Sequence, residues 1–285
     1  MVKYVEDWKE YTCIDTGDGE KLEKIGNITV RRPDPWCIWK KEEENTWNKV
    51  DAHYHRSNSG GGYWEYKKKI NEFWNIKYKD YTFRISLTPF KHIGLFPEQA
   101  YNWNFIEEKL KNTKDKKVLN LFSYTGAASV VAAKNGASVT QVDAAKGMNE
   151  WSKENAKLNE VDNRIRFITD DVIKFVEREI RRGNKYDAII MDPPSYGRGP
   201  NKELWRLEDN LYELIEKTMQ LLSEDPLFVI VNCYSSGITP LILNNLLNKT
   251  IKKTYNGNIE TNELGLPIQN QNMILPCGIY GRWYK

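Results

Sequence analysis

The chain has 285 residues, of which 40% are hydrophobic and 28% charged, so its composition is that of a soluble globular protein with one large domain or two smaller ones. Its formal net charge of +3 is too small to indicate a polyanionic partner by itself. No basic stretch followed by an apolar one opens the chain, and no apolar run approaches the roughly 20 residues of a membrane span, so we expect a cytoplasmic protein. Scattered cysteines without a C-x-x-C pair argue against a disulfide scaffold or a cysteine zinc site: Cys13, Cys37, Cys233 and Cys277.

Residues 1–88 are predicted to form a β-rich module that holds most of the tryptophans. The stretches GNITVRR (26–32) and FWNIKYKDYTFRISL (73–87) are typical of strands, and Lys79-Asp80 falls where the second would turn as a hairpin. The segment RRPDP is incompatible with a helix interior, and SNSGGGYW (57–64) is predicted to be a loop. Residues 89–115 are expected to be a connecting loop and helix.

From residue 116 the pattern alternates between strand and helix. The predicted strands are 116–122, 137–143, 164–169, 186–192 and 226–234, and the predicted helices between them are 126–136, 145–159, 171–182 and one around residues 211–222. In the helix 145–159, Met148, Trp151, Asn155 and Leu158 share one face, which we expect to be the buried one. Alternating strands and helices predict an α/β fold: a doubly wound, mostly parallel sheet, Rossmann-like, over residues 116–285.

Ligands of such sheets bind beyond the carboxyl ends of the strands, where the strand order reverses. The first strand is followed by LFSYTGAAS, in which Gly126 opens a helix; the second ends in Asp143, and the third in Asp170-Asp171-Val172. Small residues and a helix N-terminus admit a ligand close to the backbone, and a carboxylate accepts hydrogen bonds from ribose hydroxyls. A single aspartate after a strand is more often a helix cap, but three in order, spaced as one sheet requires, favour a ligand site.

The fourth strand leads into Asp192-Pro193-Pro194-Ser195-Tyr196. Two prolines fix the backbone in one extended shape, their carbonyls are free to accept hydrogen bonds from an amine, and Tyr196 presents a ring for stacking. Such a corner suits the positioning of a planar base.

These motifs resemble those of class I S-adenosylmethionine-dependent methyltransferases. More narrowly, VLNLFSYTGAAS, VTQVDAAKG, ITDDVIKF and IIMDPPSYGRG, together with FKHIGLFPEQ at 90–99, are similar to the bacterial large-subunit rRNA cytosine-C5 methyltransferase family. The resemblance covers residues 80–236 and implies a methyltransferase that uses S-adenosylmethionine and modifies RNA, with carbon 5 of cytosine as the first-choice acceptor.

The resemblance also implies roles for individual residues. Asp192 and Pro193 would lie at the methyl-transfer point, with Tyr196 beside them. The other implied cofactor contacts are to the methionine part (Phe122, Ser123, Tyr124, Gly126), to the ribose (Asp143, with Ala144 next to it), to the adenine (Asp171, Val172) and from a closing segment (Lys91, Gly94, Phe96, Gln99).

Two features depart from that family. Residues 1–88 do not resemble the PUA-type RNA-binding domain of its long members. The position after the Asp-Pro corner holds Pro194 and Ser195 where two-cysteine cytosine enzymes carry a cysteine, so the candidate nucleophile is Cys233 in VIVNCYSSG, which we also weigh as a small buried residue.

Three alternatives stay open. The Asp-Pro-Pro-Ser-Tyr corner also suits methyl transfer to a nitrogen of a base or of a protein. The aromatic N-terminal module, with Arg31-Arg32 and Lys67 to Lys69, also suits a non-catalytic RNA-binding protein. His53 and His55 on one strand face are able to chelate, but no third ligand is apparent, so no metal is predicted.

Overall fold

The computed structural model describes residues 1–42, 44–57, 61–198, 204–234 and 237–285. The chain divides into two compact units, which we call the small unit (residues 3–101 and 265–277) and the large unit (residues 1–2, 102–264 and 278–285). The domain boundaries expected at residues 88 and 115 stay predictions, and the small unit includes residues 265–277, which no sequence pattern assigned to it. Within the described ranges, no helix combines the length and the apolar character of a membrane span.

The small unit consists mainly of strands. Its larger sheet has the order β2-β3-β4-β5-β6, in which only the β4–β5 neighbours run parallel, and β7 pairs with β8 as an antiparallel hairpin. Tyr78 lies opposite Tyr81, which confirms the turn expected at Lys79-Asp80. The elements in residues 1–101 are β1 (Val2–Lys3), β2 (Tyr11–Gly17), β3 (Glu20–Ile25), β4 (Ile28–Pro33), α1 (Glu44–Trp47), β5 (Ala52–Arg56), β6 (Gly62–Tyr66), β7 (Trp74–Tyr78), β8 (Tyr81–Ile85) and the 3-10 turn η1 (Pro97–Gln99).

Residues 100–285 contain the predicted succession of strands and helices, and the predicted fold class is confirmed. Two antiparallel strands at its end and a short hairpin, β13–β14, were not predicted. The elements are α2 (Ala100–Leu110), β9 (Lys117–Leu121), α3 (Ala127–Lys134), β10 (Ser138–Asp143), α4 (Lys146–Leu158), η2 (Asp162–Arg164), β11 (Ile165–Thr169), α5 (Val172–Arg182), β12 (Ala188–Met191), β13 (Tyr196–Arg198), β14 (Leu204–Arg206), α6 (Leu207–Met219), β15 (Phe228–Cys233), α7 (Pro240–Lys249), η3 (Ile251–Lys253), β16 (Asn258–Pro267) and β17 (Ile274–Tyr284).

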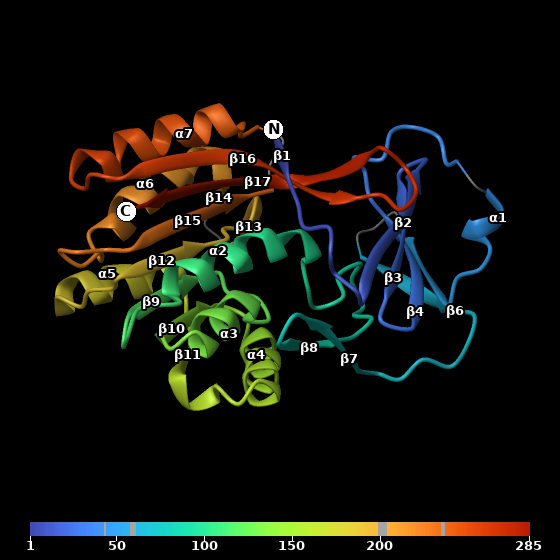
Figure 1. Cartoon of the computed structure of the whole chain (residues 1–285), viewed down its shortest axis with the longest axis horizontal. Helices are drawn as coiled ribbons and strands as arrows, with labels where there is room; N and C mark the ends of the chain where they lie inside the picture. Colours follow the sequence, from blue (N-terminus) through green and yellow to red (C-terminus); the bar gives the residue numbers. More distant parts are fainter. Residues whose placement is uncertain (43, 58–60, 199–203, 235–236) are drawn as a thin grey trace. The chain divides into compact units, whose positions relative to one another are not determined.

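The large sheet has the order β1-β16-β17-β15-β12-β9-β10-β11 (Figure 1). Strands β15, β12, β9, β10 and β11 run parallel, and β17 is antiparallel to β15. The order reverses between β9 and β12. Strands β10 and β11 follow on one side of β9, whereas β12 and β15 follow on its other side. Ligands of doubly wound sheets bind at this reversal, so the ends of β9, β10 and β12 mark the place to look.

The two faces of the sheet differ in chemistry. On one face, apolar strand residues such as Leu119 and Val229 form a continuous core with the buried sides of α5, α6 and α7. On the other face, buried polar strand residues bond to helices α2, α3 and α4: Asn120 to Ser129 (2.8 Å), Ser152 to Gln141 (2.9 Å), and Asn102 to Asn232 (2.8 Å). Side-chain hydrogen bonds on this polar face hold α3 and α4, the helices that adjoin the loops after β9 and β10.

The buried face of helix α4 overlaps the predicted one only in part: Asn155 is buried and Met148 and Trp151 are partly buried, as expected, but Leu158 is not. Leu158 is 41% exposed, whereas Asn149, Ser152, Asn155 and Ala156 are buried. The apolar spacing was misleading because this helix packs on the polar face of the sheet, where its asparagines and serine have hydrogen-bond partners.

Candidate active site

The loop that follows β9 has an unusual backbone. Phe122 and Tyr124 adopt positive φ angles of 57° and 52°, and Gly126, at the start of α3, has a φ of 77°. A left-handed backbone conformation at a residue other than glycine costs roughly 1–3 kcal/mol, and residues in this conformation are concentrated at functional sites. Gly126 is required for a second reason: a Cβ there would lie 1.8 Å from Ser152 Oγ. The loop is therefore held tightly between the sheet and α4.

Ser123 carries an unsatisfied hydroxyl in this loop. The residue is 8% exposed, and its Oγ has no hydrogen-bond partner in the part of the chain that the structure describes. A buried hydroxyl without a partner costs about 1–3 kcal/mol, so its retention calls for an explanation. A polar group of a bound ligand would supply one.

Asp143, at the end of β10, is bound to the same loop. Its Oδ2 accepts a hydrogen bond from the backbone N–H of Tyr124, and its Oδ1 accepts one from Ala145, both at 2.9 Å. Burial raises the pKa of Asp143, and these two hydrogen bonds oppose the rise. Each carboxylate oxygen has a second lone pair, so ribose hydroxyls still find acceptors here. Ala144 beside it is exposed.

The carboxylates after β11 have local partners. Asp171 caps α5, its Oδ1 accepting from Lys174 N at 2.9 Å, and Asp170 pairs with Arg178. The cap is the alternative role weighed for Asp171, and it leaves the other carboxylate oxygen for a ligand. Val172 is buried in the first turn of α5.

The corner after β12 is anchored on both sides. The Pro194 carbonyl accepts a hydrogen bond from Trp205 Nε1 at 2.6 Å, and the Ser195 carbonyl accepts one from Leu207 N at 3.0 Å. The expectation that both proline carbonyls are free was therefore wrong for Pro194. The Pro193 carbonyl accepts no hydrogen bond from the residues that the structure describes.

Beyond the prolines the chain enters the β13–β14 hairpin. Tyr196 pairs with Arg206 across it and is 59% exposed, so its ring is accessible for stacking. The ring of Trp205, on the opposite strand, lies 6.1 Å from that of Phe122 and connects this hairpin to the loop after β9. Sequence reasoning missed Trp205, because only the hairpin brings it back to the proline corner.

Cys233 ends β15 and is 1% exposed. Burial raises the pKa of its thiol, and the nearby carboxylates of Asp192 and Glu208 raise it further. A nucleophilic thiol requires the opposite surroundings, namely a cationic or hydrogen-bonding group that stabilises the thiolate. The structure thus places Cys233 beside Asp192 but in the environment of an inert buried thiol.

The predicted closing segment belongs to the small unit. Gly94 has a φ of 92°, Gln99 is buried, and Phe96 precedes the turn η1. The Lys91 carbonyl accepts a hydrogen bond from Arg32 Nη1 at 2.8 Å, and burial lowers the pKa of the Lys91 amine. That these four residues close over the cofactor stays a prediction.

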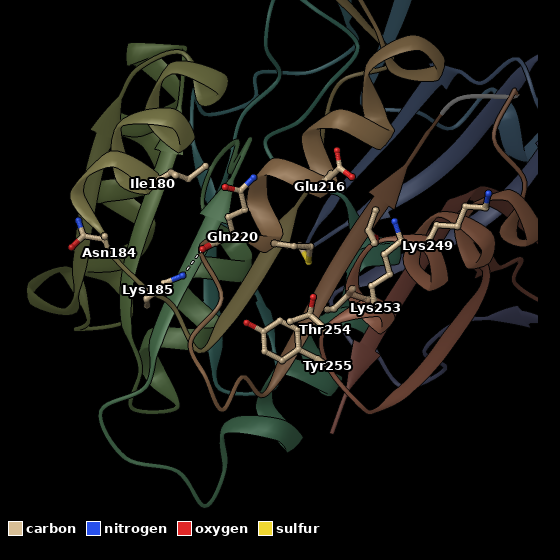
Figure 2. Close-up of a pocket in the computed structure, with 13 residues that line it drawn as sticks. Ile180, Asn184, Lys185, Glu216, Gln220, Lys249, Lys253, Thr254 and Tyr255 are labelled. Atoms are coloured by element: carbon tan, nitrogen blue, oxygen red, sulfur yellow. Dashed lines mark hydrogen bonds between the residues drawn. The ribbon is translucent and has the colours of Figure 1, made fainter.

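A cavity of about 520 Å³ lies where helices α5, α6 and α7 end (Figure 2). Lys185 Nζ donates to the carbonyl of Gln220, just beyond α6, at 2.6 Å, and Lys249 lies in the last turn of α7. Cationic side chains near helix C-termini complement the negative end of the helix dipole. None of the predicted site residues lines this cavity, and we assign its lysines a structural role.

The large unit brings together, at the reversal of strand order, the loop after β9, the carboxylate that ends β10 and the corner after β12. This donor set is compatible with S-adenosylmethionine: Ser123 and the α3 N-terminus would hold polar groups, and Asp143 would hold the ribose, as the sequence predicts. Fold and site together are those of a nucleoside-cofactor-binding enzyme domain.

Comparisons with known proteins agree with a nucleoside cofactor and identify the family. The family model described as S-adenosylmethionine-dependent methyltransferase matches residues 38–243, and the chain belongs to this family. The crystal structure of the SAM-dependent methyltransferase from Agrobacterium tumefaciens is similar over 100% of this chain and 93% of that one, with a TM-score of 0.94 and 33% sequence identity. The enzyme class and the cofactor predicted from the sequence are confirmed.

Two curated relatives match over shorter ranges. The ribosomal RNA large subunit methyltransferase K/L of Pseudoalteromonas atlantica is 34% identical over 142 residues, which are 49% of this chain and 19% of the relative. The ribosomal RNA large subunit methyltransferase K of Neisseria meningitidis serogroup B is 24% identical over 233 residues, 81% of this chain and 60% of the relative. Their names do not state an acceptor atom.

Proposed function

We propose that this methyltransferase acts on a base of ribosomal RNA and that the acceptor atom is a nitrogen. The RNA part is supported by the two curated relatives, whose names describe ribosomal RNA large subunit methyltransferases. The nitrogen part is supported by one observation: at the carboxyl end of the sheet, the Cys233 thiol is buried, while the corner from Asp192 to Tyr196 is anchored and partly exposed.

The corner supplies what a nitrogen acceptor needs. Bound S-adenosylmethionine supplies an electrophilic methyl group. The Asp192 carboxylate and the Pro193 carbonyl are acceptors for the hydrogens of an amino group, which orients its nitrogen and provides a base for the departing proton. Tyr196 offers a ring face for the base, since single-stranded bases are held by stacking on aromatic side chains. Because the Pro194 and Ser195 carbonyls are already bonded, this geometry exists before the substrate arrives.

Carbon 5 of cytosine, the first-choice acceptor predicted from the sequence, requires a nucleophilic side chain in addition to the positioned cofactor. It becomes nucleophilic only after a thiolate adds at carbon 6. Cys233 is the cysteine at this end of the sheet, and both its burial and the adjacent carboxylates favour the neutral thiol. Ser195 stands where two-cysteine enzymes carry their other cysteine. We therefore place nitrogen ahead of carbon.

Membership of the methyltransferase family also favours catalysis over a non-catalytic RNA-binding role. A protein amino group is the remaining acceptor of the same chemistry, and the experiment below separates it from RNA.

The experiment is methyl transfer from labelled S-adenosylmethionine to ribosomal subunits, purified ribosomal RNA and total cell protein, followed by mass spectrometry of the nucleosides. We expect label in ribosomal RNA as a base methylated on nitrogen, and at least about 100-fold slower labelling with Asp192→Asn. A 5-methylcytidine product would overturn the nitrogen assignment and return attention to Cys233. Label confined to protein would overturn the RNA assignment.

A further inference from the structure

The small unit contains a cluster of imidazoles and a carboxylate. His53 and His55 lie two residues apart on β5, so both side chains project from the same face of the sheet, and their ring centroids are 3.9 Å apart. Glu65 lies opposite His53 in the antiparallel β5–β6 register, and its Oε2 is 2.9 Å from His55 Nε2. This carboxylate is a third candidate ligand that the sequence did not reveal, because strand pairing alone brings it to the histidines.

The cluster has the composition and size of a divalent metal site. One ligand atom from each of His53, His55 and Glu65 lies within 4.8 Å of the other two. Zn²⁺ takes imidazole nitrogens at about 2.0–2.1 Å and carboxylate oxygens at about 2.0–2.2 Å, in a tetrahedron that two histidines and one glutamate fill to three corners. Small side-chain rotations bring ligand atoms at these separations onto one ion. All three residues are partly buried, which shields them without closing access.

A second carboxylate, from Glu20, adjoins these three side chains. Glu20 Oε1 lies 3.0 Å from His53 Nε2, and Glu20 also pairs with Arg31 and Lys41. Glu65 in turn pairs with Lys67 through its other oxygen, Oε1. Both carboxylates are thus held at the cluster and neutralised by cations that a bound metal ion would replace or repel.

We propose that His53, His55 and Glu65 bind a divalent metal ion of the zinc class, with Glu20 or water as the fourth ligand. The ion joins β5 to β6 and stabilises the small unit. The residues of this site all belong to the small unit's sheet, and the proposal does not rest on the RNA or nitrogen assignments.

The test is Zn²⁺ binding to the whole, metal-stripped chain, measured by calorimetry and by competition with a chromophoric chelator. We expect one Zn²⁺ per chain and a higher midpoint of thermal unfolding with the metal. His53→Gln, His55→Gln and Glu65→Gln should each weaken binding at least about tenfold, the scale on which even indirect changes to metal sites act. His92→Gln, the remaining histidine, is the matched control and should bind as wild type.

One variant should gain Zn²⁺ affinity, a result that misfolding would not produce. Lys67→Met removes the cation that pairs with Glu65 and should tighten Zn²⁺ binding, whereas Lys68→Met, whose lysine pairs with Asp51, should not. The Co²⁺-substituted chain should show the spectrum of nitrogen and oxygen ligands without a thiolate charge-transfer band. Unchanged affinity in both histidine variants, an equal loss in His92→Gln, or a thiolate band would each overturn the proposal.

Discussion

Asp143 Oδ2 lies 2.9 Å from the backbone nitrogen of Tyr124, so the carboxylate that ends β10 also shapes the strained loop after β9. The residue predicted to bind the cofactor's ribose and the loop predicted to hold its methionine part are therefore parts of one structure. A change at Asp143 acts on both.

We accordingly expect Asp143→Ala to lose S-adenosylmethionine binding by about 10- to 100-fold, because a hydrogen bond to a charged group contributes roughly 1.5–3 kcal/mol and two backbone donors lose their acceptor. Calorimetric titration with the cofactor measures this directly. Asp162→Ala, at an exposed carboxylate in η2, is the control for a general effect of lost charge. Wild-type affinity in a folded Asp143→Ala chain would remove the ribose assignment.

Cys233→Ala should retain methyl-transfer turnover within about threefold, because a buried thiol with a raised pKa contributes no nucleophile. Asp192→Asn should lower kcat by about 10²–10⁴-fold, the usual contribution of a positioned general base. Single-turnover rates at saturating cofactor compare the two. Loss of turnover in Cys233→Ala, with the thermal unfolding midpoint preserved, would reinstate the thiol as nucleophile.

Much of the candidate site could be proposed from the sequence because its signals are local. A strand followed by Gly126, an acidic residue ending the next strand and a proline corner are each contained in a few consecutive residues, and the parallel sheet brings strand ends together. The remaining features depend on pairing between distant segments. Glu65 reaches the histidines through strand register, Trp205 reaches Pro194 through a hairpin, and Ser152 was hidden because α4 buries polar side chains, contrary to the apolar spacing.

We expect Trp205 to act as a positioning residue, with its effect in kcat rather than in cofactor affinity. Trp205→Phe keeps an aromatic ring near Phe122 but removes the 2.6 Å hydrogen bond to the Pro194 carbonyl. The freed corner should reduce kcat about 3- to 10-fold, in line with a net 0.5–1.5 kcal/mol for one hydrogen bond. Steady-state kinetics with a cofactor titration separates the two parameters. A change confined to cofactor Kd would contradict a role at the corner.

Gly126 and Gly136 offer a matched pair, since both have left-handed backbone. A Cβ at Gly136 would meet nothing within 4 Å, whereas one at Gly126 would overlap Ser152 Oγ. Gly136→Ala should therefore cost only the conformational penalty of about 1–2 kcal/mol, and Gly126→Ala should cost more and also weaken cofactor binding. Urea unfolding and cofactor titration of both variants measure these effects. Equal behaviour of the two would show that the close approach at Gly126 relaxes without consequence.

Acid stability should depend on Glu23, whose carboxylate is fully buried in the small unit. Burial alone would raise its pKa, but the charges of Arg32 and Lys21, together with hydrogen bonds from Arg32 and Tyr11, outweigh burial and hold the pKa at about 2, against an ordinary value of 4.5. A carboxyl group with a lowered pKa in the folded state stabilises that state above its ordinary pKa and loses this contribution as pH falls. We therefore expect the free energy of unfolding to decline between about pH 4.5 and pH 2.

Glu23→Gln should flatten that decline and lower stability at pH 7 by about 3–5 kcal/mol, because it leaves Arg32 buried without its counter-charge. Urea unfolding of the whole chain from pH 3 to pH 7, followed by tryptophan fluorescence, reports mainly on the small unit, where most of the tryptophans lie. Glu72→Gln, at an exposed carboxylate of the same unit, should keep the wild-type profile. If Glu23→Gln keeps the full acid decline, the buried pair with Arg32 is not its origin, and the partly buried Glu20, whose pKa is also about 2, becomes the next group to replace.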